Sequence, residues 1–281
     1  MSTLSAADVA ELLLATAESG GPAAAVVIVG ASRDGVTGRR LAVIRPSGDR
    51  ESRHGGLGYS ALDAAALELM REALDATRSR DGLREVHVAG ERFELYLEVR
   101  RPVQELIVVG AGHIAQPMAH VGSLLGFKVT VLDDRPDFAT RERFPDADRL
   151  IRADFSDPFA DIPLHERSHI LLVTRGHKYD YDCLIRALRT DPPPAYIGMI
   201  GSRRRVRATF VQLIDEGFSM EVIERIHAPV GLDVGAETPE EIAVAVAAEL
   251  VMVQRGGTGL PLKGVERIAE RFFSRTSEDA K

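Results

Sequence analysis

The stretch Leu106-Ile-Val-Val-Gly110-Ala-Gly112-His-Ile-Ala115 decides the fold. Its first four residues are apolar, which is typical of a buried strand, and a glycine turn follows them directly. In the pattern Gly-x-Gly-x-x-Ala, Gly110 permits a tight turn and Gly112 leaves room for a pyrophosphate beside the backbone. Ala115 is small enough to let the following helix pack closely on the strand. We therefore predict a Rossmann-type domain that holds a phosphate-bearing ligand at the start of this helix.

After the glycine turn, apolar strands alternate with helical patterns. Strands are expected at 106–109, 129–132, 149–153, 169–173 and 196–200. Nearly continuous apolar strands that alternate with helices indicate a parallel sheet covered on both faces. A final helix is expected over about 239–254, because Thr238 is a suitable N-cap, Pro239 suits the first helical position and Glu241 completes a capping box.

The residues before the turn follow a different pattern. They predict a helix at about 6–19, a hairpin with strands near 25–29 and 38–46, a glycine loop at 54–58, a helix at about 60–78, and strands near 86–88 and 93–99. Arg100-Arg101-Pro102 is the expected linker. The sequence thus predicts an α/β protein in which a smaller α+β domain, 1–102, precedes a Rossmann-like parallel-sheet domain, 103–281.

Composition excludes several classes of function. The net charge is -7, so the domain-wide basic footprint of a nucleic-acid-binding protein is missing, and a membrane surface is disfavoured for the same reason. Cys183 is the only cysteine, so no intrachain disulfide can form and a reducing compartment is expected. No apolar run approaches the roughly 18 residues of a membrane span, and the N-terminus does not resemble a signal peptide. We expect a cytoplasmic protein.

Acidic and basic residues end the second predicted strand of the parallel sheet. Asp133 and Asp134 lie there, and Asp133 follows Gly112 by 21 positions, close to the spacing of the acid that binds a ribose hydroxyl. Arg135 comes next and suits a 2′-phosphate. The sequence therefore leaves NAD and NADP both open. It also leaves open a Rossmann-like fold whose nucleotide site is unused.

An arginine cluster follows the fifth predicted strand, in the stretch 201–207, Gly-Ser-Arg-Arg-Arg-Val-Arg. Ser202 is a natural N-cap. Arginines in a first helical turn oppose the helix dipole at a cost of about 0.3–1 kcal/mol each. We interpret Gly201, Ser202, Arg203 and Arg204 as an anion site at the carboxyl edge of the sheet. The alternative is a solvated basic face paired with Asp215, Glu216 and Glu221.

The loop expected after the fourth strand, 174–180, holds Thr174, His177 and Asp180. His177 and Asp180 suit acid–base work or metal binding. A metal is the weaker hypothesis, because no second His or Cys lies nearby at metal-ligand spacing. The alternative is an ordinary hydrogen-bonded loop histidine.

The segment 227–235 precedes the last helix and offers His227 and Asp233 as polar candidates for a ligand site, although a plain turn would explain most of it. Two other features favour structural explanations. The glycine loop at 54–58 is more simply a turn than an anion nest, and Cys183 lies on an apolar helix, as a core residue would.

These residues together resemble the XdhC/CoxI family, accessory proteins of xanthine dehydrogenase and related molybdenum hydroxylases. The likeness is sharpest in the glycine turn with His113, the Thr174-Arg-Gly-His177 loop, Tyr196-Ile-Gly-Met-Ile-Gly-Ser-Arg-Arg-Arg205 and His227-Ala-Pro-Val-Gly-Leu-Asp-Val-Gly-Ala-Glu-Thr-Pro-Glu-Glu241. It differs at the N-terminal glycine loop, where many members carry a cysteine and this chain has Tyr59 and Ser60 after Gly58. A thiolate from that loop therefore cannot hold the metal end of a ligand.

The resemblance implies a cytoplasmic, dimeric factor that binds molybdenum cofactor, supports its sulfuration and delivers it to an apo-hydroxylase of the xanthine dehydrogenase type. A cysteine desulfurase is a further expected partner, and the cofactor is expected in its molybdopterin form. The expected cofactor-binding residues are Gly110, Gly112, His113, Ile114, Asp133, Asp134, Arg135, Thr174, His177, Gly201, Ser202, Arg203, Arg204, His227 and Asp233. No metal ligand is assigned.

Two other hypotheses compete with a chaperone that has no turnover of its own. One is an NAD(P)-dependent oxidoreductase that uses His177 or His227 as the proton donor. The other is a structural or regulatory partner with a vestigial nucleotide site. A dehydrogenase usually carries its substrate domain after the nucleotide fold, whereas here the extra domain comes first, is small and has no obvious acid–base pair. This order favours the chaperone.

Overall fold

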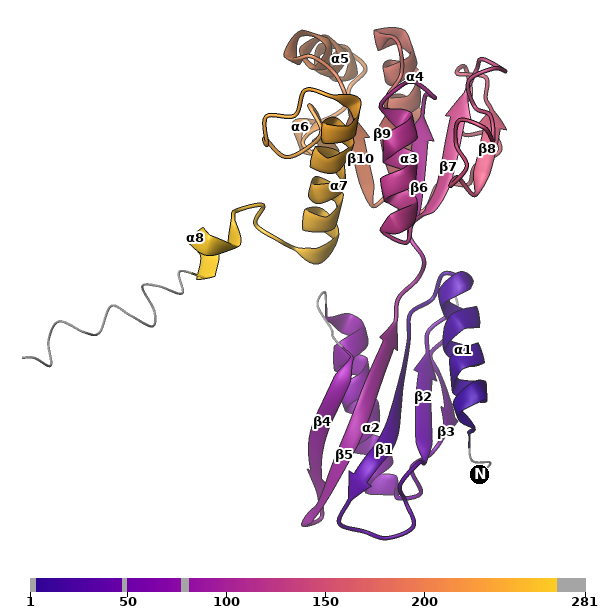
Figure 1. The fold of residues 1–281 in the computed structure, drawn as a ribbon, viewed down its shortest axis with the longest axis vertical. Coiled ribbons are helices and arrows are strands. Elements are labelled where there is room, and N and C mark those ends of the chain that lie inside the picture. The colour runs from indigo at the N-terminus through magenta and orange to yellow at the C-terminus, as the bar shows by residue number, and fades with distance from the viewer. Residues whose placement is uncertain (1–3, 47–49, 77–80, 267–281) are drawn as a thin grey trace, which may run out of the picture.

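The structure is a computed structural model that describes residues 4–46, 50–76 and 81–266 (Figure 1). Two sheets follow each other along the chain, one antiparallel and one parallel. Each has hydrophobic clusters of its own, built from residues before 100 and after 105 respectively. The predicted division at residue 102 agrees with this separation of cores, and it stays a prediction about domains.

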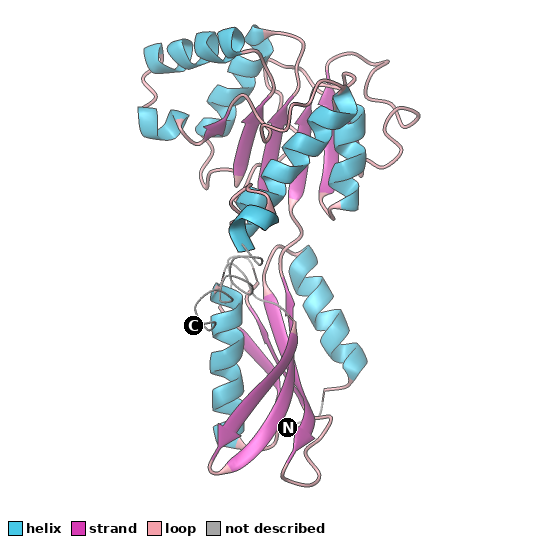
Figure 2. Cartoon of the chain, turned by 60° about the vertical axis from the view of Figure 1, so that its left-hand side comes forward, coloured by secondary structure: helices cyan, strands magenta, loops and turns pink. Residues whose placement is uncertain are grey.

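The N-terminal module is a five-stranded sheet in the order β3-β2-β1-β5-β4. Its elements are α1 (Ala6–Glu18), β1 (Ala23–Ala31), β2 (Arg40–Ile44), β3 (Ser52–Gly55), α2 (Ser60–Asp75), β4 (Gly82–Val88) and β5 (Glu91–Arg100). Alternate residues of β1 face opposite sides: Val26 packs in the cluster with α2, and Ala25 in the cluster with α1. The sheet therefore carries a helix on either side (Figure 2).

One expectation for this module was wrong. The glycine loop predicted at 54–58 begins inside β3, where His54 and Gly55 pair with Ala42 and Leu41 of β2. Beyond the strand, the backbone N–H of Leu57 donates to the Asp63 carboxylate at 2.6 Å. The chain's own carboxylate thus takes a position that an anion nest would offer to a ligand.

The C-terminal module is a six-stranded parallel sheet in the order β11-β10-β9-β6-β7-β8. Its strands are β6 (Glu105–Val109), β7 (Lys128–Asp133), β8 (Arg149–Arg152), β9 (Ser168–Leu172), β10 (Tyr196–Met199) and β11 (Ile226–His227). Counted from β6, this is the order 3-2-1-4-5-6 of the Rossmann fold, with its switch point between β6 and β9. The predicted fold class is confirmed.

Helices cover both faces of the parallel sheet. They are α3 (Ala115–Leu124), α4 (His177–Leu188), α5 (Arg203–Asp215), α6 (Met220–Ile223) and α7 (Pro239–Arg255). A further helix, α8 (Leu262–Glu266), follows α7 along the chain. Leu106 and Val108 of β6 pack in the cluster with α3 and α7, while Ile107 and Val109 pack in the cluster with α4 and α5. This alternation explains why the strand is apolar throughout.

The helix α7 begins and ends as its sequence predicts. Thr238 and Glu241 form the capping box around Pro239, and Gly256 ends the helix in the left-handed conformation at φ 62°. Across the described ranges, no helix combines the length and the apolar character that crossing a bilayer requires.

Two sequence expectations near the sheet's edge were wrong. His227 lies in the short strand β11, which pairs with β10, and not in a loop. His177 and Asp180 lie in α4, which begins at His177, so the predicted loop 174–180 is shorter than expected. A strand of two residues is too short to leave a periodic pattern, and α4 starts without a side-chain N-cap that would have marked its first turn.

Candidate functional site

The first glycine of the turn is required by the fold. Gly110 has φ +104°, and a Cβ there would lie 2.7 Å from the carbonyl oxygen of Val173. The next residue, Ala111, donates its N–H to the carboxylate of Asp133 at 2.7 Å. Strand β6, strand β7 and the end of β9 therefore determine the shape of the turn together.

The second glycine is not required by packing. Gly112 has no left-handed φ, and a Cβ there would meet no atom within 4 Å. Within the described residues, the N–H groups of Gly112 and His113 find no acceptor. The helix α3 then starts at Ala115 without a side-chain cap or an acidic residue in its first turn. Open space beside unpaired N–H groups at a helix start suits an anion.

Asp133, the expected ribose acceptor, is engaged inside the protein. The residue is 1% exposed. Besides the N–H of Ala111, its carboxylate accepts the backbone N–H of Arg135 at 3.0 Å and the Arg135 guanidinium at 2.8 and 2.9 Å. Burial alone would raise the pKa of Asp133, but these donors outweigh it and hold the pKa far below its ordinary value. Asp133 fastens the glycine turn to β7, and both of its oxygens are occupied.

Asp134 is paired with a residue that the sequence patterns did not single out. Arg175 binds the Asp134 carboxylate through two hydrogen bonds of 2.7 Å, and its guanidinium lies 4.7 Å from the ring centroid of Tyr179. Asp134 raises the pKa of Arg175 further above its ordinary value. In the sequence, only its position just after the strand β9, at the carboxyl edge of the sheet, could have marked Arg175 as a candidate site residue.

The arginine cluster divides into two parts. Arg205 turns inward, where its Nε lies 2.6 Å from the carboxylate of Asp180 and its Nη2 lies 2.9 Å from the hydroxyl of Thr174. Asp180 is 0% exposed, so this is a buried ion pair that joins α4 to α5. Thr174 also donates to Asp180 at 2.6 Å. Arg205 and Thr174 thus have a structural role, since their contacts with Asp180 fix the start of α5 against the start of α4.

Arg203 and Arg204 are exposed and, in the part of the chain that the structure describes, have no carboxylate partner. The acidic residues of the alternative, Asp215, Glu216 and Glu221, do not pair with them there. Ser202 caps α5 by accepting from the N–H of Arg205 at 3.3 Å, as its sequence predicts. The two arginines therefore remain as cations available to an anion.

A second polar cluster surrounds His227. Its Nδ1 lies 2.5 Å from Oε1 of Glu249, a residue of α7 that is 6% exposed. Tyr196 donates its hydroxyl to the same oxygen at 3.0 Å, and the N–H of Gly231 donates to Oε2 at 2.5 Å. Sequence reasoning found His227 and missed Glu249, which looked like an ordinary helical glutamate. Asp233 is exposed in the following loop.

The topology brings most of the predicted residues to one edge. Gly110 and Asp134 directly follow β6 and β7, and Thr174 and Gly201 come two residues after β9 and β10. Parallel strands place their carboxyl ends together, so these residues share one edge. His227 ends β11, at the outer limit of the same edge. His177 is the first residue of α4, whose start also faces this edge.

Two observations limit the chemistry of the site. Among the described residues, no group of three or more His, Cys, Asp or Glu side chains could hold a metal ion. Cys183 is 0% exposed in the core of α4, and burial raises the pKa of its thiol well above the ordinary value. The thiol is therefore an inert core group, as the sequence predicts.

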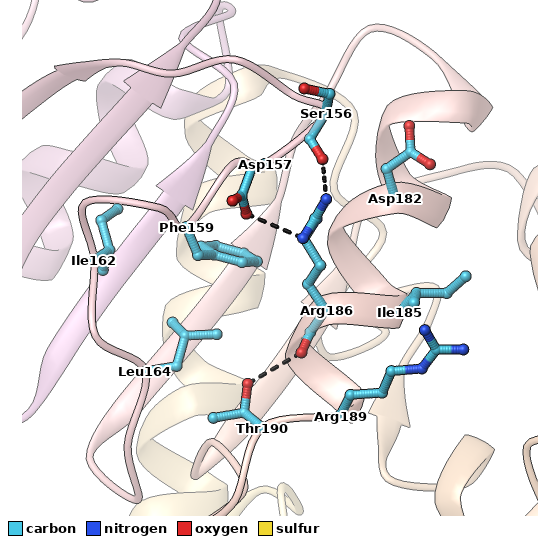
Figure 3. A pocket seen from close by; sticks show the side chains of 10 residues that line it. All are labelled: Ser156, Asp157, Phe159, Ile162, Leu164, Asp182, Ile185, Arg186, Arg189 and Thr190. Atoms are coloured by element: carbon cyan, nitrogen blue, oxygen red, sulfur yellow. Dashed lines mark hydrogen bonds and ion pairs between the residues drawn. The ribbon is translucent and has the colours of Figure 1, made fainter.

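The cavity of about 480 Å³ shown in Figure 3 lies elsewhere. The segment from Ser156 to Leu164 and the later turns of α4 line it, with Phe159 and Ile185 on its walls. Arg186 closes one side through an ion pair with Asp157 at 3.1 Å (Figure 3). This cavity lies away from the glycine turn, since it uses the carboxyl end of α4 and not its start.

Residues 106–250 match the family described as the XdhC Rossmann domain. The chain belongs to the XdhC family. The match covers more than half of the chain and includes both the glycine turn and the His227 cluster. The resemblance seen in the sequence motifs is confirmed.

Two curated relatives are similar to part of this chain. One, from Escherichia coli K12, is named uncharacterized protein YqeB and is 32% identical over 60% of this chain and 31% of its own length. The other, from Bacillus subtilis 168, is named as a probable subunit of xanthine dehydrogenase and is 32% identical over 57% of this chain and 46% of its own. The chain thus spans less than half the length of either relative.

A crystal structure described as a xanthine dehydrogenase from Bacillus halodurans has the same fold. It is 19% identical, with a TM-score of 0.51, over 90% of this chain and 96% of that one. The similarity therefore extends to the N-terminal module as well.

Proposed function

We propose that this protein is an accessory factor of a xanthine-dehydrogenase-type molybdenum hydroxylase. It binds the molybdenum cofactor as cargo at the carboxyl edge of the parallel sheet, supports its sulfuration and delivers it to the apo-hydroxylase. Membership of the XdhC family and the name of the Bacillus subtilis relative support the association with xanthine dehydrogenase.

One observation carries the proposal. The space beside Gly112 is open, the N–H groups of Gly112 and His113 lack acceptors among the described residues, and Arg203 and Arg204 lack carboxylates at the same sheet edge. A phosphate satisfies both features, because backbone N–H groups and arginine forks are its two usual partners in proteins. Molybdopterin carries such a phosphate.

The state of Asp133 weighs against the alternative of an NAD(P)-dependent oxidoreductase. A nicotinamide dinucleotide uses the acid at the end of the second strand to bind its adenosine ribose. Here the donors from Ala111 and Arg135 already occupy both oxygens of Asp133, and Arg175 occupies Asp134. A ribose would have to displace Arg135 from the buried carboxylate of Asp133, or Arg175 from Asp134, before it could bind.

Partners follow from the proposed role. An apo-hydroxylase receives the cofactor, a cysteine desulfurase supplies the sulfur, and the factor acts as a homodimer in the cytoplasm. In this proposal the metal end of the cofactor is exposed to its partners. Exposure of that end would suit sulfuration and transfer.

A cofactor titration tests the proposal. The purified protein is mixed with molybdopterin cofactor released from a molybdenum hydroxylase, and binding is followed by cofactor fluorescence after gel filtration. We expect stoichiometric binding by the wild type and at least tenfold weaker binding by the double variant Arg203→Ala with Arg204→Ala. Arg207→Ala is the matched control, because Arg207 is equally exposed but lies one turn further along α5.

Delivery is measured with the same proteins. Loaded wild type restores activity to an apo-hydroxylase, and the double arginine variant does so poorly at equal concentration. Tight NADPH or NADH binding with turnover of a substrate, and no cofactor binding, would contradict the proposal.

A further inference from the structure

The cluster around His227 has features that the phosphate site does not explain. A carboxylate that is 6% exposed, Glu249, accepts from three separate donors: the imidazole of His227, the hydroxyl of Tyr196 and the backbone N–H of Gly231. Burial would raise the pKa of Glu249, but these donors outweigh it and hold the pKa below its usual range. The cluster is therefore a fully ionised acid with a histidine bound to it.

Packing holds the imidazole in one plane. The rings of His227 and Tyr196 stack with centroids 4.4 Å apart and an interplanar angle of 28°. Tyr196 can lie there because Gly198, two residues on along β10, has no side chain: a Cβ at Gly198 would come within 2.8 Å of the tyrosine ring. The glycine in Tyr196-Ile-Gly-Met thus serves the histidine cluster.

The hydrogen bond to Glu249 decides which nitrogen of His227 carries the proton. Nδ1 faces a carboxylate oxygen, so Nδ1 must be the donor. In the neutral ring, the lone pair then lies on Nε2. This nitrogen has no partner among the described residues, and the side chain is 33% exposed at the carboxyl end of β11. Nε2 is therefore presented as an acceptor at the edge where the phosphate site lies.

We infer that Nε2 of His227 accepts a hydrogen bond from a ring N–H of a bound heterocycle, and that Glu249 is the positioning residue that sets this tautomer. The inference rests on the proposed function and deepens it, since it assigns the heterocyclic end of the ligand to β11. The proton can move from the ring N–H to Nε2, which leaves the heterocycle anionic and the imidazolium paired with Glu249. No other reactant is needed.

The distances across the sheet allow one ligand to place its phosphate near the glycine turn and the arginines and its heterocycle near His227. β11 is three strands away from β6 in the sheet order, which corresponds to about 14 Å at about 4.8 Å per strand. The arginines at the start of α5 follow β10, between the two. A ligand with a phosphate at one end and a fused heterocycle at the other can reach from this region to His227, and a pterin offers an amide-like ring N–H.

The decisive variant is Glu249→Gln. The backbone N–H of Gly231 is a fixed donor, so it keeps the single oxygen of the new amide, and the amide NH₂ turns towards His227. Nδ1 must then accept, and the ring proton moves to Nε2. The substitution therefore converts Nε2 from acceptor to donor without removing the imidazole. In serine proteases, replacing the carboxylate of the catalytic triad by an amide changes the tautomer of the histidine in the same way.

Nitrogen-15 NMR measures the tautomer directly on the full chain, with His227→Phe identifying the signal. We expect the proton on Nδ1 in the wild type and on Nε2 in Glu249→Gln. We also expect both variants to bind molybdopterin cofactor at least tenfold more weakly, while inorganic phosphate, followed by the amide signal of Gly112, binds as in the wild type. Glu240→Gln, an exposed glutamate of the same helix, is the control and should change neither readout.

The outcomes separate this inference from the function on which it rests. The inference is overturned if the proton of His227 is found on Nε2 in the wild type. It is also overturned if Glu249→Gln and His227→Phe bind the cofactor as tightly as the wild type. If the wild type binds no cofactor, the proposed function fails and the inference with it. Loss of phosphate binding in Glu249→Gln shows general damage to the edge and also counts against the assignment.

Discussion

At the scale of single residues, the partners of a charged group decide its role. Asp133 stands where a ribose acceptor is expected, yet four donor contacts from Ala111 and Arg135 make it part of the scaffold. Arg205 belongs to an arginine run that suggests ligand binding, yet it pairs with buried Asp180. Arg203 and Arg204 differ from Arg205 only in their direction, and no partner among the described residues neutralises them.

Asp133→Asn tests the structural role of that carboxylate. The pKa of Asp133 is depressed in the folded protein, so its contribution to stability is complete above the unfolded-state pKa of about 4 and is lost as the pH falls towards the folded-state pKa. We expect the variant to lose about 1.5–3 kcal/mol of unfolding free energy at pH 7 and the difference from wild type to shrink below pH 4.

Urea unfolding of the wild type and of Asp133→Asn at a series of pH values measures this difference in unfolding free energy. Asp137→Asn, at an exposed aspartate nearby, is the control and should be neutral. A constant difference between wild type and Asp133→Asn from pH 7 to pH 3 would contradict the assignment.

The sequence identifies candidate residues at this scale but not their pairing. His227 was predicted because it is a polar residue in the segment before the last helix, in a stretch that resembles the family. Glu249 was missed because a helical glutamate resembles every other solvent-facing glutamate until α7 is packed on the sheet. Contacts such as Arg205 with Asp180 join residues that are 25 positions apart, and spacing along one chain does not reveal them.

At the scale of elements, the two glycines of the turn have separate purposes. Gly110 serves the fold, since its φ of +104° and the nearby carbonyl oxygen of Val173 exclude a side chain. Gly112 has an ordinary backbone conformation and open surroundings, so packing does not require a glycine there, and we propose that the space is used by the ligand. The turn therefore offers a matched pair of substitutions within three residues.

Gly112→Ala should leave the unfolding free energy within about 1 kcal/mol of wild type, because alanine fits the conformation and lowers the entropy of the unfolded chain. It should weaken phosphate and cofactor binding at least tenfold, because the new methyl group fills the space that an anion needs. Gly110→Ala should instead destabilise the fold by more than about 1 kcal/mol.

Thermal unfolding and isothermal titration of both variants check this contrast. If Gly112→Ala binds the ligand as tightly as the wild type, the glycine turn is not part of the binding site. Severe loss of stability in Gly112→Ala would contradict the separate roles of the two glycines, because it would show that packing also requires Gly112.

Long apolar strands were predictable at this scale, and short elements were not. The five strands expected in the parallel sheet all form. The signal is clearest in β6, where the β-branched residues Ile107–Val109 are buried on both faces of the sheet. β3 and β11 were missed: β11 has two residues, and β3 contains the polar Ser52–His54, so neither shows the period of a strand.

At the scale of the whole molecule, the fold places all the proposed contacts on one edge. The reversal of strand order between β6 and β9 opens the carboxyl edge there, and the glycine turn, Arg175 and the start of α5 follow neighbouring strands. The fold class and this edge were predictable from the sequence. The strand order required the structure, and so did the contacts from which we propose separate positions for the phosphate and the heterocycle along the edge.

Backbone amide exchange with and without molybdopterin cofactor tests the central claim most directly, because the N–H groups of Gly112 and His113 lack acceptors, among the described residues, until a ligand arrives. We predict slower exchange on cofactor binding in peptides covering 110–116 and 201–206, and no change at the cavity shown in Figure 3. Protection confined to that cavity, or unchanged exchange at the glycine turn with cofactor bound, would contradict the account.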